Sequence, residues 1–120
     1  MTQIFLSVPS VVQSTIDALE QIGFNNIIIS SVTVMELYQG MGNKTELAQM
    51  QRKLRFYDVL HMDEAISAKA VEFIEKFRLS HHLQIPDAII GASASVYQIP
   101  LFTYNTRDFN FLPDIILYQE

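Results

Sequence analysis

Cysteine is absent from the 120 residues of this chain. Disulfide bonds and thiolate metal sites are therefore excluded, because both require cysteine sulfur. The sequence also has no apolar run that approaches the ~18 residues of a membrane-spanning helix. Residues 1–6 lack the basic stretch with which a secretory signal begins. We therefore expect a chain that stays out of the membrane, and a cytoplasmic location fits these absences.

Positive charge is also scarce. Eight Lys and Arg residues stand against 13 Asp and Glu residues, which gives a net charge of -5. A negative net charge argues against broad, non-specific attraction to nucleic acid. It does not exclude a nuclease, because an acidic metal site contributes several of the negative charges and bound cations would offset them.

Several common catalytic motifs are missing as well. The four glycines are scattered, so no glycine-rich loop can cradle a phosphate, and no serine stands in a nucleophile elbow. His81 and His82 are adjacent and would point roughly 100° apart on a helix, so they cannot chelate one metal from one face. We interpret them, and the solitary His61, as surface or helix-end residues. The five tyrosines form no recognisable base-stacking platform and are interpreted as core or rim residues.

Apolar residues make up 49% of the chain, and they follow the periods of strands and helices. Short apolar runs predict strands at residues 4–6, 27–30, 100–103 and 115–118, and a short extended segment at residues 56–61. A helix is expected around residues 31–40, and one with Pro86 in its first turn. Three further helices are expected, each beginning after a capping residue. The candidate caps are Ser10 for the first, Asn43 or Thr45 for the second, and Asp63 for the third.

Strands that alternate with helices imply a parallel sheet with helices on both faces. We therefore predict one α/β domain spanning residues 1–120, a three-layer α/β/α arrangement with a central parallel sheet. The last predicted helix carries small residues that would permit a close approach to the sheet: Ala88, Gly91, Ala92 and Ala94.

Three acidic residues stand where a strand or loop gives way to a helix: Glu36, Asp87 and Asp108. In an open α/β sheet such junctions converge on the crevice at the carboxyl ends of the strands. Three carboxylates that meet there, without cysteine or paired histidines, would form a site for a hard cation.

Each acid also has a simpler explanation. Thr33 and Glu36 have the spacing of a capping box, in which the Glu side chain reaches back to the amide that begins the helix. Asp87 lies in a first helical turn, where the helix dipole favours negative charge. Asp108 could cap the turn that contains Phe109 or pair with Arg107. Taken singly, none of the three requires a metal site.

The sequence around all three acids resembles a known family. Glu36-Leu-Tyr-Gln-Gly40, after an apolar strand, resembles the first acidic helix motif of PIN domains. Ile85-Pro-Asp-Ala-Ile-Ile-Gly-Ala92 resembles their next acidic motif. Leu101-Phe-Thr-Tyr-Asn-Thr-Arg-Asp-Phe109 resembles the last one, with Thr103, Asn105 and Asp108 in the matching positions. The resemblance runs from about residue 27 to residue 117, and the small size is similar to VapC-type toxins of bacterial toxin–antitoxin pairs.

This resemblance implies a PIN-like fold and a metal-dependent endoribonuclease. It implies Mg²⁺ or Mn²⁺ as cofactor, with Glu36, Asp87 and Asp108 as catalytic metal ligands. Thr103 and Asn105 would orient a carboxylate or a metal-bound water, or serve only as turn residues. An RNA substrate, an antitoxin partner and a homodimer are implied in the same way. Divalent ions suit this chemistry, because they acidify the attacking water and neutralise the charge that develops on the phosphate.

The chain departs from the family at its first strand. PIN domains usually open with a strand that ends in Asp-Thr-Asn, and that Asp is a central metal ligand. Here Ser7-Val-Pro-Ser10 follows Ile4-Phe-Leu6, and no Asp occurs before Asp17. Either the chain lacks this ligand, or residues are missing between Leu6 and Ser7, in which case their Cα atoms would lie much more than ~3.8 Å apart.

Two other functions remain as alternatives. A chain without the first ligand could be a non-catalytic PIN-like domain that binds RNA or protein. A phosphoacceptor receiver-like domain also clusters acids, but it needs an Asp at the end of a central strand and a Lys on a later loop. Here the predicted strand ends offer Ser30 and Thr103, and no Lys follows residue 76, which disfavours the receiver interpretation.

Overall fold

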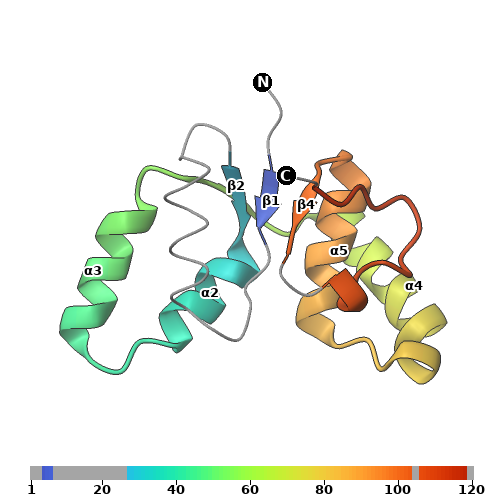
Figure 1. The fold of residues 1–120 in the computed structure, drawn as a ribbon, viewed down its shortest axis with the longest axis horizontal. Helices are drawn as coiled ribbons and strands as arrows, with labels where there is room; N and C mark the ends of the chain where they lie inside the picture. Colours follow the sequence, from blue (N-terminus) through green and yellow to red (C-terminus); the bar gives the residue numbers. More distant parts are fainter. Residues whose placement is uncertain (1–3, 7–26, 104–105, 119–120) are drawn as a thin grey trace.

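The computed structural model of the protein describes residues 4–6, 27–103 and 106–118. These residues form a mixed α/β structure with a small parallel sheet (Figure 1). The strands are β1 (Ile4–Leu6), β2 (Ile27–Ser30), β3 (Asp58–Leu60) and β4 (Leu101–Phe102). The helices are α2 (Ser31–Gln39), α3 (Lys44–Leu54), α4 (Glu64–His81) and α5 (Ile85–Tyr97), and η2 (Thr106–Asp108) is a 3-10 turn. None of the helices in these ranges is both long and apolar enough to cross a membrane.

The strands pair in the order β3-β2-β1-β4, and every pair is parallel. The strands predicted at residues 4–6 and 27–30 are confirmed, and the ambiguous segment at 56–61 contains β3. The strand predicted at 100–103 is shorter than expected. The predicted helix between Ser10 and Gly23, and the Leu6–Ser7 distance, lie outside the residues that the structure describes.

The strand predicted at residues 115–118 was wrong in extent. Leu117 forms one isolated parallel bridge with Leu101. The amide of Leu101 donates to the carbonyl of Ile116 at 2.7 Å, and the amide of Tyr118 donates to the carbonyl of Leu101 at 2.8 Å. Because β4 is only two residues long, it offers this segment no longer edge to pair with.

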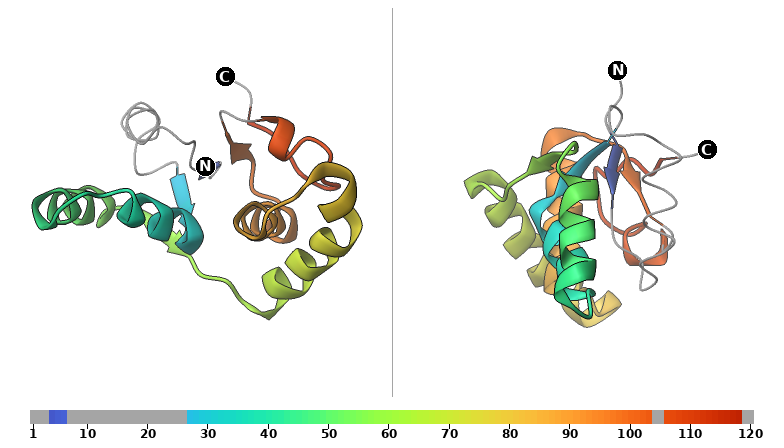
Figure 2. Two further views of the ribbon diagram at one scale, coloured as in Figure 1. Left: turned by 90° about the horizontal axis from the view of Figure 1, so that it is seen from below. Right: turned by 90° about the vertical axis from the view of Figure 1, so that its left-hand side faces the viewer.

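Helices cover both faces of the sheet, α2 and α3 on one side and α4 and α5 on the other (Figures 1 and 2). The alternation of side chains along the strands explains this division. Ile27 and Ile29 of β2 pack with Leu37, Met50 and Leu54 in one apolar cluster. The intervening Ile28 packs against the other cluster, whose fully buried members include Ile66, Phe73, Ile90 and Leu101.

Most of the predicted helix starts are confirmed. Asp63 caps α4, where its Oδ1 accepts from the amide of Ile66 at 2.8 Å. Asn43, rather than Thr45, caps α3 by accepting from the amide of Glu46 at 2.9 Å. Pro86 lies in the first turn of α5. At α3 and α4, a side chain that accepts from an otherwise unpaired amide fixes where the helix begins.

The capping box predicted for Thr33 and Glu36 is wrong. The helix α2 begins at Ser31, and Ser30 is its N-cap, whose Oγ accepts from the amide of Val32 at 3.1 Å. Glu36 is therefore the sixth residue of the helix and lies too far along it to reach back to the capping amide. Capping no longer accounts for Glu36.

We predict that Ser30→Ala lowers the free energy of unfolding by about 1 kcal/mol, because the buried hydroxyl is lost from the N-cap of α2. Thr45→Ala removes a hydroxyl from an exposed helical position that caps nothing, so it should change stability by less than about 0.5 kcal/mol. Urea denaturation of the two variants measures both values. Equal stability of the Ser30→Ala variant and the wild type would contradict the assigned cap.

Candidate functional site

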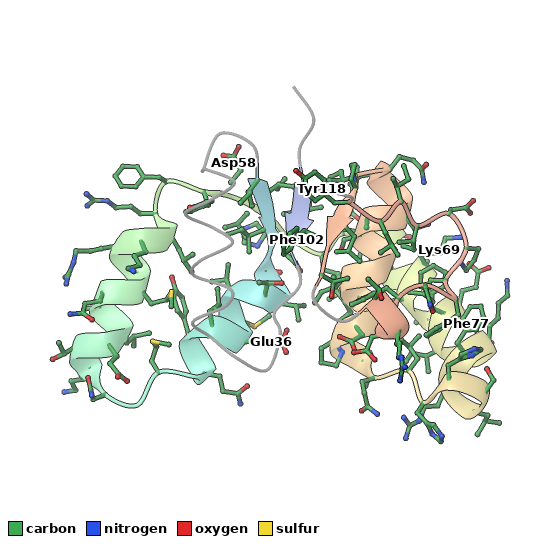
Figure 3. The ribbon with its side chains drawn as sticks, viewed as in Figure 1. Glu36, Asp58, Lys69, Phe77, Phe102 and Tyr118 are labelled. Carbon is green, nitrogen blue, oxygen red and sulfur yellow. The ribbon has the colours of Figure 1, made fainter. Side chains whose placement is uncertain are left out.

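The topology carries the three acids to one end of the sheet. Glu36 lies on α2, which directly follows β2, and Asp108 closes η2, which follows β4. Asp87 lies in the first turn of α5. The end of α5 precedes the start of β4 by only a few residues, so the first turn of α5 lies at the opposite, carboxyl end of the strand. Figure 3 shows Glu36 at this end of the sheet and Asp58 at the other.

A close contact between α5 and the segment 109–112 joins two of these acids. Asp87 and Gly91 are four residues apart on α5 and therefore share one face of the helix. A Cβ atom added to Gly91 would lie 2.6 Å from Cδ1 of Leu112 and 3.8 Å from Cδ1 of Phe109. Glycine thus permits the segment to pack directly on α5. Phe109 is buried there, and this holds its neighbour Asp108 near the first turn of α5.

The electrostatics place all three acids in one neighbourhood. Burial, the charge of Asp108 and the charge of Glu36, in decreasing order, together raise the pKa of Asp87 to about 6. Burial also raises the pKa of Glu36. Like charges shift the pKa of a carboxyl group appreciably only when they lie within several ångströms of it. Both other acids are therefore near Asp87.

The helix dipole alone does not explain Asp87. A first-turn position stabilises the carboxylate and lowers its pKa. The pKa of Asp87 is nevertheless raised, so burial and the neighbouring negative charges outweigh the dipole. The N-cap of α5 is Gln84, which makes no side-chain capping bond. Asp87 is a crowded carboxylate rather than a simple capping residue.

Comparison with known proteins gives the family. A model of the PIN domain matches residues 12–113. This chain belongs to the PIN domain family. A comparison with curated protein sequences gave no match.

Solved structures from toxin-antitoxin and related complexes resemble the chain over nearly its whole length. A chain of a toxin-antitoxin complex from Klebsiella pneumoniae is 25% identical, with a TM-score of 0.70, and the match covers 99% of this chain and 100% of that one. A chain of DNA-bound VapBC from Salmonella typhimurium is 19% identical, with a TM-score of 0.81 and 98% of both chains covered. A chain of FitAcB from Neisseria gonorrhoeae is 20% identical, with a TM-score of 0.70, covering 98% of this chain and 97% of that one. The last two likenesses show the PIN-like fold alone.

The donor chemistry of the three acids fits a hard cation. The three acids offer carboxylate oxygens, the ligands preferred by Mg²⁺ and Mn²⁺. Within residues 4–6, 27–103 and 106–118, however, no three His, Asp or Glu side chains are arranged to hold one ion. Charge interaction reaches several ångströms, whereas Mg²⁺ ligands lie ~2.1 Å from the ion. The acids are thus electrostatic neighbours without converging on a single point.

The two supporting residues of the PIN motif are only partly described. Thr103 directly follows β4 and is half-buried. Asn105 lies outside the described residues, so its role stays a prediction. The sequence indicated neither Ser30 as the residue that sets the start of α2 nor the packing of Gly91 against Leu112. The face of α5 that carries small residues was expected to approach the sheet, but at Gly91 this face packs against the segment 109–112 instead.

We predict that Asp87→Asn stabilises the metal-free protein at high pH. The pKa of Asp87 in the folded protein, about 6, exceeds the ordinary value of 3.8. Its contribution to stability is therefore fully present below the ordinary value and is lost as the pH rises through about 6. At pH ~8 in chelator, Asp87→Asn should raise the free energy of unfolding by on the order of 1 to 3 kcal/mol, and the gain should shrink toward zero below pH ~4.

Denaturant unfolding across this pH range measures the effect. Asp58→Asn is the matched control, because Asp58 is exposed at the other end of the sheet. It should change stability by less than about 0.5 kcal/mol. A gain for Asp87→Asn that does not depend on pH would show that the carboxyl group is not crowded as the structure has it.

Proposed function

We propose that this PIN domain is a metal-dependent endoribonuclease that hydrolyses RNA phosphodiester bonds as the toxin of a toxin–antitoxin pair. The observation that carries the proposal is the raised pKa of Asp87, which burial and the charges of Asp108 and Glu36 produce together. Strongly perturbed acids that cluster at the carboxyl edge of an α/β sheet are typical of functional sites. The proposal includes a single three-layer α/β/α domain over residues 1–120, acting in the cytoplasm.

In this proposal Glu36, Asp87 and Asp108 hold Mg²⁺ or Mn²⁺, which when bound makes water more acidic and offsets charge on the phosphate. Mg²⁺ keeps several waters and is commonly bound through only one or two carboxylates. Three carboxylates are therefore enough ligands for one Mg²⁺ ion. Asp87 must lose its proton to bind a cation, so activity should rise with pH through about 6. Thr103 and Asn105 are proposed to orient a carboxylate or a water.

An antitoxin is the proposed protein partner. The chain from the Klebsiella pneumoniae toxin-antitoxin complex, 25% identical over 99% of this chain, supports this partner. A negatively charged toxin site suits a partner segment that presents a basic side chain to the clustered acids.

The alternative is a non-catalytic PIN-like domain that binds RNA or protein. Two observations favour it. The Asp that usually ends the first strand is absent from the sequence before Asp17. In addition, the described residues contain no group of three side chains placed around one ion position.

We predict that the wild-type protein cleaves single-stranded RNA in Mn²⁺ and that Asp87→Asn lowers the rate at least about 100-fold, because a metal ion contributes several kcal/mol to such reactions. Gel analysis of end-labelled RNA measures cleavage. Asp58→Asn, purified in parallel, should keep the wild-type rate and so excludes a contaminating nuclease. Millimolar Mn²⁺ should also raise the melting temperature of the wild type and not of Asp87→Asn. RNA binding without cleavage by the wild type would instead support the alternative.

A homodimer is proposed on the α4/α5 side of the domain. An apolar groove of about 400 Å³ lies there, with Ala70, Val71, Ile74 and Ile85 among its lining residues. Val71 is 58% exposed and Ile85 is 67% exposed. The first turn of α4 carries an acid and its last turn carries bases. Antiparallel contact of α4 with its copy across a two-fold axis would therefore bring opposite charges together.

We predict that Val71→Glu weakens the dimer more than about 10-fold, because it places a charge in the apolar contact. The side chain is exposed in one copy, so the melting temperature should hardly change. Light scattering across a concentration series measures the mass. Phe56→Glu is the control, since Phe56 is equally exposed at 59% but lies in the loop after α3. A wild type that stays monomeric at high concentration would contradict the proposed dimer.

A further inference from the structure

Three rings gather where α4 ends: Phe77, His81 and Phe111, here called the ring cluster. The rings of His81 and Phe111 are stacked, with centroids 4.1 Å apart and planes 13° apart. Phe77 supports both, at 5.8 Å from His81 and 5.2 Å from Phe111. A hydrogen bond of 2.7 Å between Oγ of Ser80 and Nδ1 of His81 further orients the imidazole. The His81 ring is therefore held in a fixed orientation although the residue is exposed.

The ring cluster connects the two segments that carry acids of the candidate site. His81 is the last residue of α4, and α5, which begins four residues later, carries Asp87 in its first turn. Phe111 follows Asp108 by three residues, and three residues span at most about 11 Å. In Figure 3, Phe77 and Glu36 both lie toward the end of the molecule at which the strands finish. The rings thus lie at the same end of the molecule as the acids, on the side of α5 that faces away from the sheet.

An exposed imidazole held in a fixed orientation, at the same end of the molecule as the proposed phosphodiester site, suits a nucleobase. Single-stranded RNA exposes the faces of its bases, which stack on Phe, His and other planar side chains. Stacking needs no net positive charge on the protein. This matters here, because a chain with a net charge of -5 gains little from general attraction to phosphates. A stacking contact can supply affinity that charge does not.

We propose that the His81–Phe111 stack is a nucleobase subsite that holds one base of a single-stranded RNA whose backbone crosses the site of Glu36, Asp87 and Asp108. The inference rests on the proposed ribonuclease function and names the feature of the substrate that is recognised. The base stacks on the exposed imidazole of His81, and Phe111 and Phe77 support that ring from behind.

The test is binding of a short single-stranded RNA that contains a fluorescent adenine analogue, whose emission is quenched on stacking. The Asp87→Asn background prevents cleavage during the measurement. In that background His81→Leu, which keeps an apolar side chain of similar size but cannot stack, should weaken binding about 5- to 100-fold and abolish quenching. His81→Phe should restore both. His61→Leu, which changes an exposed histidine outside the ring cluster, should do neither.

Two further readouts separate stacking from packing and from catalysis. The melting temperature of His81→Leu should match that of His81→Phe, whereas a purely structural role would lower it together with affinity and leave quenching of the bound RNA intact. In the active protein, His81→Leu should raise KM and leave kcat nearly unchanged. Wild-type affinity and quenching in His81→Leu would overturn the subsite even if RNA is cleaved. Quenching that depends on His81 in a protein that does not cleave RNA would support the subsite and contradict the ribonuclease.

Discussion

Repulsion between half-buried carboxylates is the constraint around which the described structure is organised. The pKa of Asp87 is raised to about 6 because burial and two neighbouring acids disfavour its charged form. Such crowding opposes folding, so other contacts must hold the acids in place. Ser30 fixes the start of α2, Pro86 fits the first turn of α5, and buried Phe109 anchors the segment that follows η2. The apolar clusters on the two faces of the sheet supply the stability against which this repulsion acts.

Much of this arrangement follows from local sequence. The apolar runs at residues 4–6 and 27–30 predict β1 and β2, and Asp63 predicts the start of α4, because period and capping chemistry act over a few residues. The capping box predicted at Thr33 was wrong because capping depends on which nearby hydroxyl lies at the start of the helix. A second hydroxyl, that of Ser30, lies at the end of β2 and accepts a hydrogen bond from the amide of Val32. Two candidate caps three residues apart cannot be ranked without knowing where the strand ends.

Tertiary contacts set the part that sequence reasoning missed. The topology of an α/β sheet is sufficient to bring Glu36, Asp87 and Asp108 to one edge. The electrostatic interaction between these acids depends in addition on the packing of residues 109–112 against Gly91. No periodic pattern in the sequence predicts that packing. The stack of His81 on Phe111 joins residues 30 positions apart. Aromatic pairs of this kind have no sequence signature, so the two histidines at the end of α4 gave no reason to expect a fixed ring.

The missing Asp of the first strand alters the balance between cation binding and stability. A fourth carboxylate at the same edge would add one more like charge beside Asp87 and would raise its pKa further. Without it the metal-free fold is under less strain, and any cation is held by fewer charges. Fewer protein ligands leave more coordination positions for water and for phosphate oxygens, which is how Mg²⁺ is usually held at phosphate-processing sites. In the proposed ribonuclease, affinity for RNA would then depend less on the metal and more on contacts with the rest of the RNA, and the proposed stacking of a base on His81 is a contact of that kind.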